Sequence, residues 1–126
     1  MFLENRFSPD FSEYWWNWIC IDVVTEQIIG QVQVSFIRET GESYLAYRVF
    51  PGYWRKGYAK ESCRKVIEFL FAEKNATKVI IEMDVRNVAS VALAESLGGK
   101  RVSHTEKVQQ IRGEWSDEYR YEIVKQ

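Results

Sequence analysis

The sequence predicts an α+β fold in a single domain over residues 1–126, and three observations carry this prediction. Short stretches rich in aromatic and β-branched residues, separated by turn residues, precede Pro51 and indicate an antiparallel meander. A long amphipathic segment then lies between two apolar stretches, which indicates a strand–helix–strand crossover. Two further strand-like stretches close the chain as a hairpin. Hydrophobic residues make up 46% of the 126 residues, which is enough for a real core.

The meander is expected to hold three strands. They cover residues 14–24, 28–37 and 44–50. Within the second strand, Gln31 and Gln33 alternate with valines, which predicts one solvent-facing side and one buried side. Residues 1–12 show no clear period, and Ser8-Pro9-Asp10 indicates a turn or a helix start.

The crossover helix is expected to end near Asn75. Its apolar positions recur at helical spacing and form one stripe; they are Ala59, Cys63, Val66, Ile67, Leu70 and Phe71. Residues 79–85 are nearly all apolar and predict a central strand, parallel to the strand before the helix.

The remainder of the chain predicts a short helix and a hairpin. Asn87-Val88-Ala89-Ser90 is typical of a helix start, and Gly98-Gly99 is a stop signal. Two strands follow, at about 101–111 and 116–124, with a turn at 112–114.

Charge and cysteine usage exclude several classes of protein. The formal net charge of −1 gives no global basic footprint, so no nucleic acid partner is expected. No run is long enough to cross a bilayer, and the N-terminus lacks the plan of a signal peptide. Cys20 and Cys63 lie in apolar contexts and match no zinc spacing. We therefore expect reduced core cysteines, no metal site, no membrane partner and a cytoplasmic location.

The strongest functional signal is the loop Trp54-Arg55-Lys56-Gly57-Tyr58-Ala59, between a strand and a helix start. A flexible glycine and flanking cations at a helix N-terminus form a phosphate cradle. The alternative is a basic surface turn. The loop is not a Walker loop, because no Gly-Lys-Ser/Thr follows, and it lacks the spaced glycines of a Rossmann fingerprint.

A second signal comes from Asn87 and Ser90. Taken alone, these residues favour simple helix capping. Their position favours a ligand site, because both helix N-termini follow neighbouring parallel strands and open on the same sheet edge.

Together the two signals resemble the GNAT (Gcn5-related N-acetyltransferase) superfamily. The loop has the family's form Gln/Arg-x-x-Gly-x-Gly/Ala, with Trp54 in the first position. That variant, the Asn87-x-x-Ser90 pattern and the hairpin around Gly113–Asp117 resemble the branch that acetylates ribosomal-protein N-termini. The resemblance covers roughly Trp18 to the C-terminus.

The resemblance implies a mixed central sheet with helices on both faces and acetyl-CoA as co-substrate. It implies that backbone N–H groups of the loop bind the CoA pyrophosphate, contributed by Arg55, Lys56, Gly57, Tyr58, Ala59 and Lys60. Arg48, Val49 and Phe50 would pair with pantetheine as an added strand. Asn87 would hydrogen-bond the pantetheine arm, and Ser90 would lie near the thioester sulfur and donate a proton to the departing thiolate.

The implied reaction is direct attack of a primary amine on the thioester. The branch often carries a carboxylate near the position of Val108-Gln109-Gln110, which cannot accept a proton. We take Glu82 as the catalytic base, with Asp84 and Glu106 as alternatives. His104 is expected to be a surface strand residue. The acceptor stays open among ribosomal protein, amino acid, polyamine and antibiotic.

The chain departs from the family at its start. The family begins with a strand and one or two helices that wall the acceptor side, and residues 1–12 would be only a remnant of this helical region. The aromatic run 14–18 would then leave apolar surface uncovered, which predicts a homodimer. Two other functions stay open: a weak or inactive acyl-CoA-binding regulatory domain, and an unrelated α+β interaction domain whose loop is only a turn.

Overall fold

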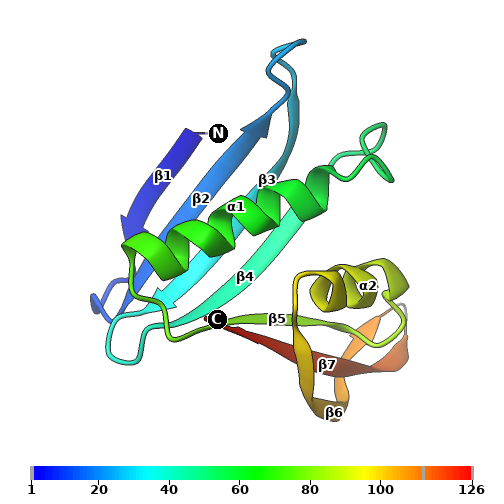
Figure 1. Ribbon diagram of the computed structural model, residues 1–126. Helices are drawn as coiled ribbons and strands as arrows, with labels where there is room; N and C mark the ends of the chain where they lie inside the picture. Colours follow the sequence, from blue (N-terminus) through cyan, green and yellow to red (C-terminus); the bar gives the residue numbers. More distant parts are fainter. Residues whose placement is uncertain (1, 112, 126) are drawn as a thin grey trace.

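A computed structural model describes the backbone of residues 2–111 and 113–125 and the side chains of residues 5–106 and 113–125. It contains a 7-stranded sheet in the order β1-β2-β3-β4-β5-β7-β6 and two helices (Figure 1). The elements are β1 (Phe2–Phe7), β2 (Glu13–Ile21), β3 (Ile28–Ile37), β4 (Glu42–Val49), α1 (Tyr58–Glu73), β5 (Lys78–Asp84), α2 (Val88–Ser96), β6 (Lys100–Ile111) and β7 (Glu114–Val124).

The sheet is mixed in the way the sequence predicts. Strands β1 to β4 form an antiparallel meander, β5 runs parallel to β4, and β7 lies between β5 and β6 as part of an antiparallel hairpin. The strand over residues 28–37 has the predicted bounds, and the crossover helix ends at Glu73. The α+β prediction is confirmed.

The N-terminal residues form a strand, which corrects the expectation of a helical remnant over 1–12. Strand β1 pairs with β2, so that Phe7 lies opposite Tyr14. The two strands are joined by a tight turn, in which the Asp10 carboxylate accepts hydrogen bonds from Ser8 and Ser12. The hydrogen bonds from Ser12, followed by that from Ser8, lower the pKa of Asp10 to about 2. The connection is thus held locally and contains no helix.

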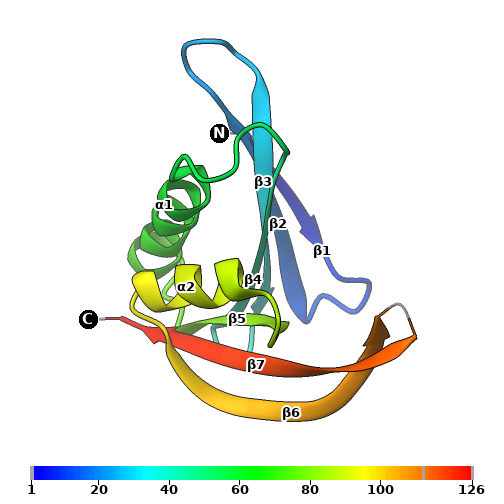
Figure 2. The same ribbon diagram turned by 90° about the vertical axis from the view of Figure 1, so that its right-hand side faces the viewer.

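Both helices lie on one face of the sheet, so the expectation of helices on both faces is wrong for the described residues (Figures 1 and 2). Figure 2 shows the sheet bending around α1 and α2. The two helices and the inner sheet face share one core; its most deeply buried members include Val32, Val34, Cys63, Val66, Leu70, Val79, Ala94 and Tyr121. Within residues 2–111 and 113–125, no helix covers the outer face.

The aromatic run is mostly buried. Trp16 and Trp18 are only 4% and 7% exposed, because they point toward α1, where Phe69 packs against both rings. Trp15 points the other way and is 41% exposed. The expectation that the aromatic run leaves apolar surface uncovered is therefore wrong for Trp16 and Trp18. The homodimer, which that expectation motivated, stays a prediction.

Both cysteines, Cys20 and Cys63, lie in the core, as the sequence predicts. Both side chains are buried, and burial raises the pKa of the Cys63 thiol to about 12. No helix in the described part of the chain is long and apolar enough to span a membrane. Among the same residues no cluster of potential metal ligands occurs. The side chains of Val108-Gln109-Gln110 lie outside the described residues.

Candidate active site

Strands β4 and β5 diverge and so open the sheet at one end. They are paired only at Glu42–Lys78, Ser43–Val79 and Tyr44–Ile80. Beyond that point β4 continues along β3 as far as Val49, whereas β5 continues along β7 as far as Asp84. Figure 1 shows the two strands separating. The edge of β4 that faces this gap can pair with an extended ligand, which would add to the sheet as a strand does.

The loop after β4 brings the N-terminus of α1 to the gap. Arg55 and Gly57 both have positive φ angles, of 61° and 79°. Gly57 is the N-cap residue of α1, and no side chain caps this helix. The first N–H groups of α1 are therefore available, and they carry the positive end of the helix dipole. This arrangement is suited to a phosphate group.

A cleft of about 790 Å³ lies between the end of β4, this loop and α2. Arg48, Arg55 and Lys60 place cations on its wall, and no carboxylate from the described residues lines it. The cleft therefore favours an anionic ligand. Its lining residues are Tyr47, Arg48, Val49, Tyr53, Trp54, Arg55, Gly57, Tyr58, Ala59, Lys60, Asn87, Ala89, Ser90, Ala92, Leu93 and Ser96.

The start of α2 forms the opposite wall. Asn87 caps this helix, since its Oδ1 accepts a hydrogen bond of 3.1 Å from the Ser90 N–H. The capping interpretation of Asn87 is thus confirmed, while its side-chain NH₂ is a donor that the cap does not use. Ser90 Oγ lies 2.8 Å from the hydroxyl of Tyr47 on β4. A side-chain hydrogen bond therefore crosses the cleft.

The structure brings the predicted donor-binding residues together on this cleft, with two exceptions. Phe50 and Lys56 belong to the same loop but do not line the cleft. Phe50 instead lies beneath the Arg48 guanidinium, 5.5 Å from its ring centre. Glu82 also does not line the cleft.

Two tyrosine hydroxyls fix the loop after β4 and the start of α1 to the β2–β3 turn, and the sequence did not indicate these contacts. The hydroxyl of Tyr58 donates to Asp22 in the β2–β3 turn over 3.3 Å, and the hydroxyl of Tyr53 donates to Gln27 in the same turn. Backbone N–H groups of this turn hold the pKa of Asp22 below its usual range, so the carboxylate stays charged. Each of these tyrosines directly follows a glycine, Tyr53 in the loop and Tyr58 at the start of α1.

Glu82 lies on the outer face of the sheet. Its neighbours Ile81 and Met83 are buried in the core, and side chains alternate along a strand. Glu82 is exposed, and Glu118 of β7 lies beside it on this face. Burial, and then the charge of Glu82, raises the pKa of Glu118. A carboxylate therefore lies on the side of the sheet opposite the cleft.

The other basic candidates are less suited to accept a proton. Asp84 is held by Arg86 at 3.1 Å and by Ser116, and the Arg86 hydrogen bonds lower the pKa of Asp84. His104 is on β6 with Nε2 2.8 Å from Asp117, and neither lines the cleft. Glu106 is exposed on the same strand.

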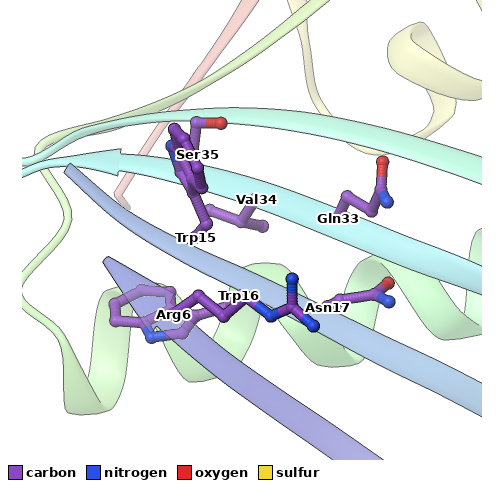
Figure 3. Close-up of a pocket in the computed structure, with 7 residues that line it drawn as sticks. All are labelled: Arg6, Trp15, Trp16, Asn17, Gln33, Val34 and Ser35. Carbon is purple, nitrogen blue, oxygen red and sulfur yellow. The ribbon is translucent and has the colours of Figure 1, made fainter. Parts of the chain in front are cut away.

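A second depression, of about 370 Å³, lies on the outer face over β1, β2 and β3. Figure 3 shows the residues that line it along β1, β2 and β3, with α1 behind the strands. Arg6, Asn17 and Gln33 supply polar groups, and Trp15 supplies an aromatic surface. The Oδ1 atom of Asn17 is buried and has no hydrogen-bond partner among the described residues. This depression and the cleft thus lie on opposite faces of one sheet.

Comparison with known proteins agrees with this geometry. The sequence model of the family described as "Acetyltransferase (GNAT) domain" matches residues 2–100. The chain belongs to the GNAT acetyltransferase family.

Two curated relatives are longer than this chain. "Uncharacterized N-acetyltransferase p20" of Bacillus licheniformis is 25% identical over 96% of this chain and 62% of the relative. "Uncharacterized N-acetyltransferase YnaD" of Bacillus subtilis is 32% identical over 79% of this chain and 58% of the relative. The chain thus spans about three fifths of the length of these two proteins.

Solved structures share the GNAT fold. A mutant of the spermidine N-acetyltransferase SpeG from Vibrio cholerae superposes with a TM-score of 0.82 at 21% identity, covering 92% of this chain and 68% of that one. A putative ribosomal-protein-serine acetyltransferase from Vibrio cholerae gives a TM-score of 0.76 at 25% identity, covering 88% and 64%. Relatives with different acceptors in their names thus share this fold.

Proposed function

We propose that the protein transfers an acetyl group from acetyl-CoA to a primary amine. The observation that carries the proposal is the cleft between the diverging strands β4 and β5, which combines a free strand edge with an uncapped helix N-terminus. Acetyl-CoA has an amide-containing arm and a diphosphate. The free strand edge can pair with the arm, and the uncapped helix N-terminus can bind the diphosphate. The family match to residues 2–100 supports the same assignment.

The donor would bind along the wall described above. The N–H groups of residues 58–60, together with the cations of Arg55 and Lys60, would hold the diphosphate. Arg48 and Val49 at the end of β4 would pair with the pantetheine arm, and the free NH₂ of Asn87 would donate to it. The thioester would then lie near Ser90, at the narrow part of the gap.

The reaction would be direct attack. The amine nitrogen forms a bond to the carbonyl carbon, the carbon–sulfur bond breaks, and the sulfur leaves with the electron pair. Ser90 would donate its proton to this sulfur and recover a proton from solvent, and the amine would lose a proton to a base. Holding both reactants in one geometry supplies a large part of the rate enhancement.

The acceptor would approach from the outer face, because the donor fills the cleft on the helix side. Glu82 lies on that outer face, which supports it as the base. The acceptor's identity stays open. An inactive acyl-CoA-binding domain is the second candidate, and the tight β1–β2 turn favours it, because no helix walls the outer face there.

The proposed function is tested by release of free CoA thiol from acetyl-CoA over a panel of amines and peptides. The wild type should turn over at least one amine. Ser90→Ala should lower kcat by about a hundredfold, because a positioned proton donor contributes that much or more, while its affinity for CoA changes little. A protein that binds acetyl-CoA but turns over no amine would support the regulatory candidate. Equal losses of turnover and of CoA affinity would show that Ser90 is only a structural cap.

Glu82→Gln should lower kcat/KM at neutral pH by about a hundredfold or more, as loss of a general base does. The loss should shrink as the pH rises toward the acceptor's pKa, which is about 7.7–8.0 for an α-amine and about 10.4 for lysine, because the free amine needs no base. The measurement is a pH profile with the best amine from the panel. Glu68→Gln, which changes an exposed carboxylate on α1 that does not line the cleft, serves as the control. A loss that stays constant with pH would contradict the role of Glu82.

A further inference from the structure

The hydrogen bond between Tyr47 and Ser90 joins the two walls of the cleft. The hydroxyl oxygens are 2.8 Å apart, although the residues are separated by 43 positions in the chain. In the part of the chain whose side chains are described, no other side-chain hydrogen bond joins β4 to α2. Both residues line the cleft. The contact is therefore located where the donor's thioester would lie.

Ser90 is held twice in this arrangement. Its backbone N–H is fixed by the Asn87 cap at 3.1 Å, and its side chain is fixed by Tyr47. Tyr47 is itself well placed, because it stands opposite Val32 on the inner face of the sheet and packs against the core. The rotamer of Ser90 is thus set by a rigid strand rather than by solvent.

Either hydroxyl can donate in this contact, and the phenol is the stronger donor because it is the more acidic of the two groups. Burial raises the pKa of the Tyr47 phenol, so this group keeps its proton at working pH and is available as a donor. A serine hydroxyl has one hydrogen and can accept as well as donate. When Tyr47 donates to Ser90 Oγ, the Ser90 hydrogen is left for an acceptor in the cleft.

We propose that Tyr47 is the positioning residue of the reaction: its hydroxyl donates to Ser90 Oγ and directs the Ser90 O–H toward the sulfur of the donor. This proposal rests on the proposed function. Because hydroxyls in a chain polarise one another, the same contact makes Ser90 a better proton donor. This role comes from the tertiary geometry, since Tyr47 and Ser90 lie 43 positions apart in the chain.

The test is Tyr47→Phe, which removes one oxygen atom and keeps the ring. We expect kcat to fall about tenfold, as expected for one lost hydrogen bond to a reacting group, with the KM for acetyl-CoA within about twofold. The double variant with Ser90→Ala should be no slower than Ser90→Ala alone, because the two hydroxyls act as one unit. Tyr44→Phe, on the outer face of the same strand and beneath Arg120, is the matched control and should keep the wild-type kcat.

Three results would overturn the proposal. They are a Tyr47→Phe kcat within twofold of the wild type, a rise in KM that accounts for the whole loss, and additive losses in the double variant. If the wild type turns over no amine, the proposed function fails separately. The thermal unfolding midpoints of the same variants then decide whether the hydroxyls are joined, because additive shifts would exclude the contact and coupled shifts would support it.

Discussion

A Gly57→Ala variant is expected to bind acetyl-CoA at least about tenfold more weakly than the wild type, because the glycine lets the backbone come close to a diphosphate. Gly57 is the N-cap of α1, has a φ of 79° and lines the cleft. A Cβ built on it meets no protein atom within 4 Å, so the new methyl group fits the protein and stands in space that the ligand needs. The measurement is the dissociation constant for acetyl-CoA by calorimetry.

Gly52→Ala is the matched control for this variant. Gly52 lies in the same loop with a φ of 95°, its Cβ also meets nothing within 4 Å, and it does not line the cleft. Both variants place alanine in a left-handed conformation, which costs about 1–2 kcal/mol. Their unfolding midpoints should therefore fall together, while only Gly57→Ala loses affinity. Equal dissociation constants for the two variants would contradict the placement of the diphosphate.

Gly30→Ala is expected to destabilise the fold by about 3 kcal/mol or more, at the upper end of the range for overpacked cores. A Cβ on Gly30 would lie 2.1 Å from the carbonyl oxygen of Arg48 and 3.0 Å from Cα of Val49. Both atoms belong to the backbone of β4, so β3 and β4 must separate where they are paired. The free energy of unfolding from urea denaturation measures this loss.

The control for Gly30→Ala is Gly113→Ala. Gly113 has a φ of 81° and open space around its Cβ, so alanine there adds backbone strain without a clash. Gly30→Ala should lose clearly more stability, and the protein that remains folded should bind acetyl-CoA more weakly, since Arg48 and Val49 line the cleft. A loss no larger than that of Gly113→Ala would show that the strands can absorb the methyl group.

The elements with strong local patterns were predictable from the sequence. Gln31 and Gln33 alternate with buried valines, and this alternation marked β3 with its observed bounds. Strand β1 was missed, because its partner in β2 defines it and its own residues show no clear period. The common face of the two helices was also missed. Periodicity shows which side of a helix is buried, but not which face of the sheet it covers.

The site was predictable where its chemistry is local. The glycine and cations of residues 54–60 identified the anion cradle, and Asn87 identified the cap of α2. The partner of Ser90 was not predictable, because Tyr47 reaches it only through the tertiary fold. The face of the sheet on which Glu82 lies could have been predicted from the sequence. Side chains alternate along a strand, and Glu82 stands between two apolar residues of β5.

The central claim is that the cleft between β4 and α2 binds acetyl-CoA, and calorimetric titration of the purified protein tests it most directly. We expect saturable binding to one site, with a dissociation constant between about 1 μM and 1 mM, which weakens with added salt and in Gly57→Ala but not in Gly52→Ala. Absence of saturable binding up to about 1 mM acetyl-CoA, or binding that Gly57→Ala leaves unchanged, would contradict it.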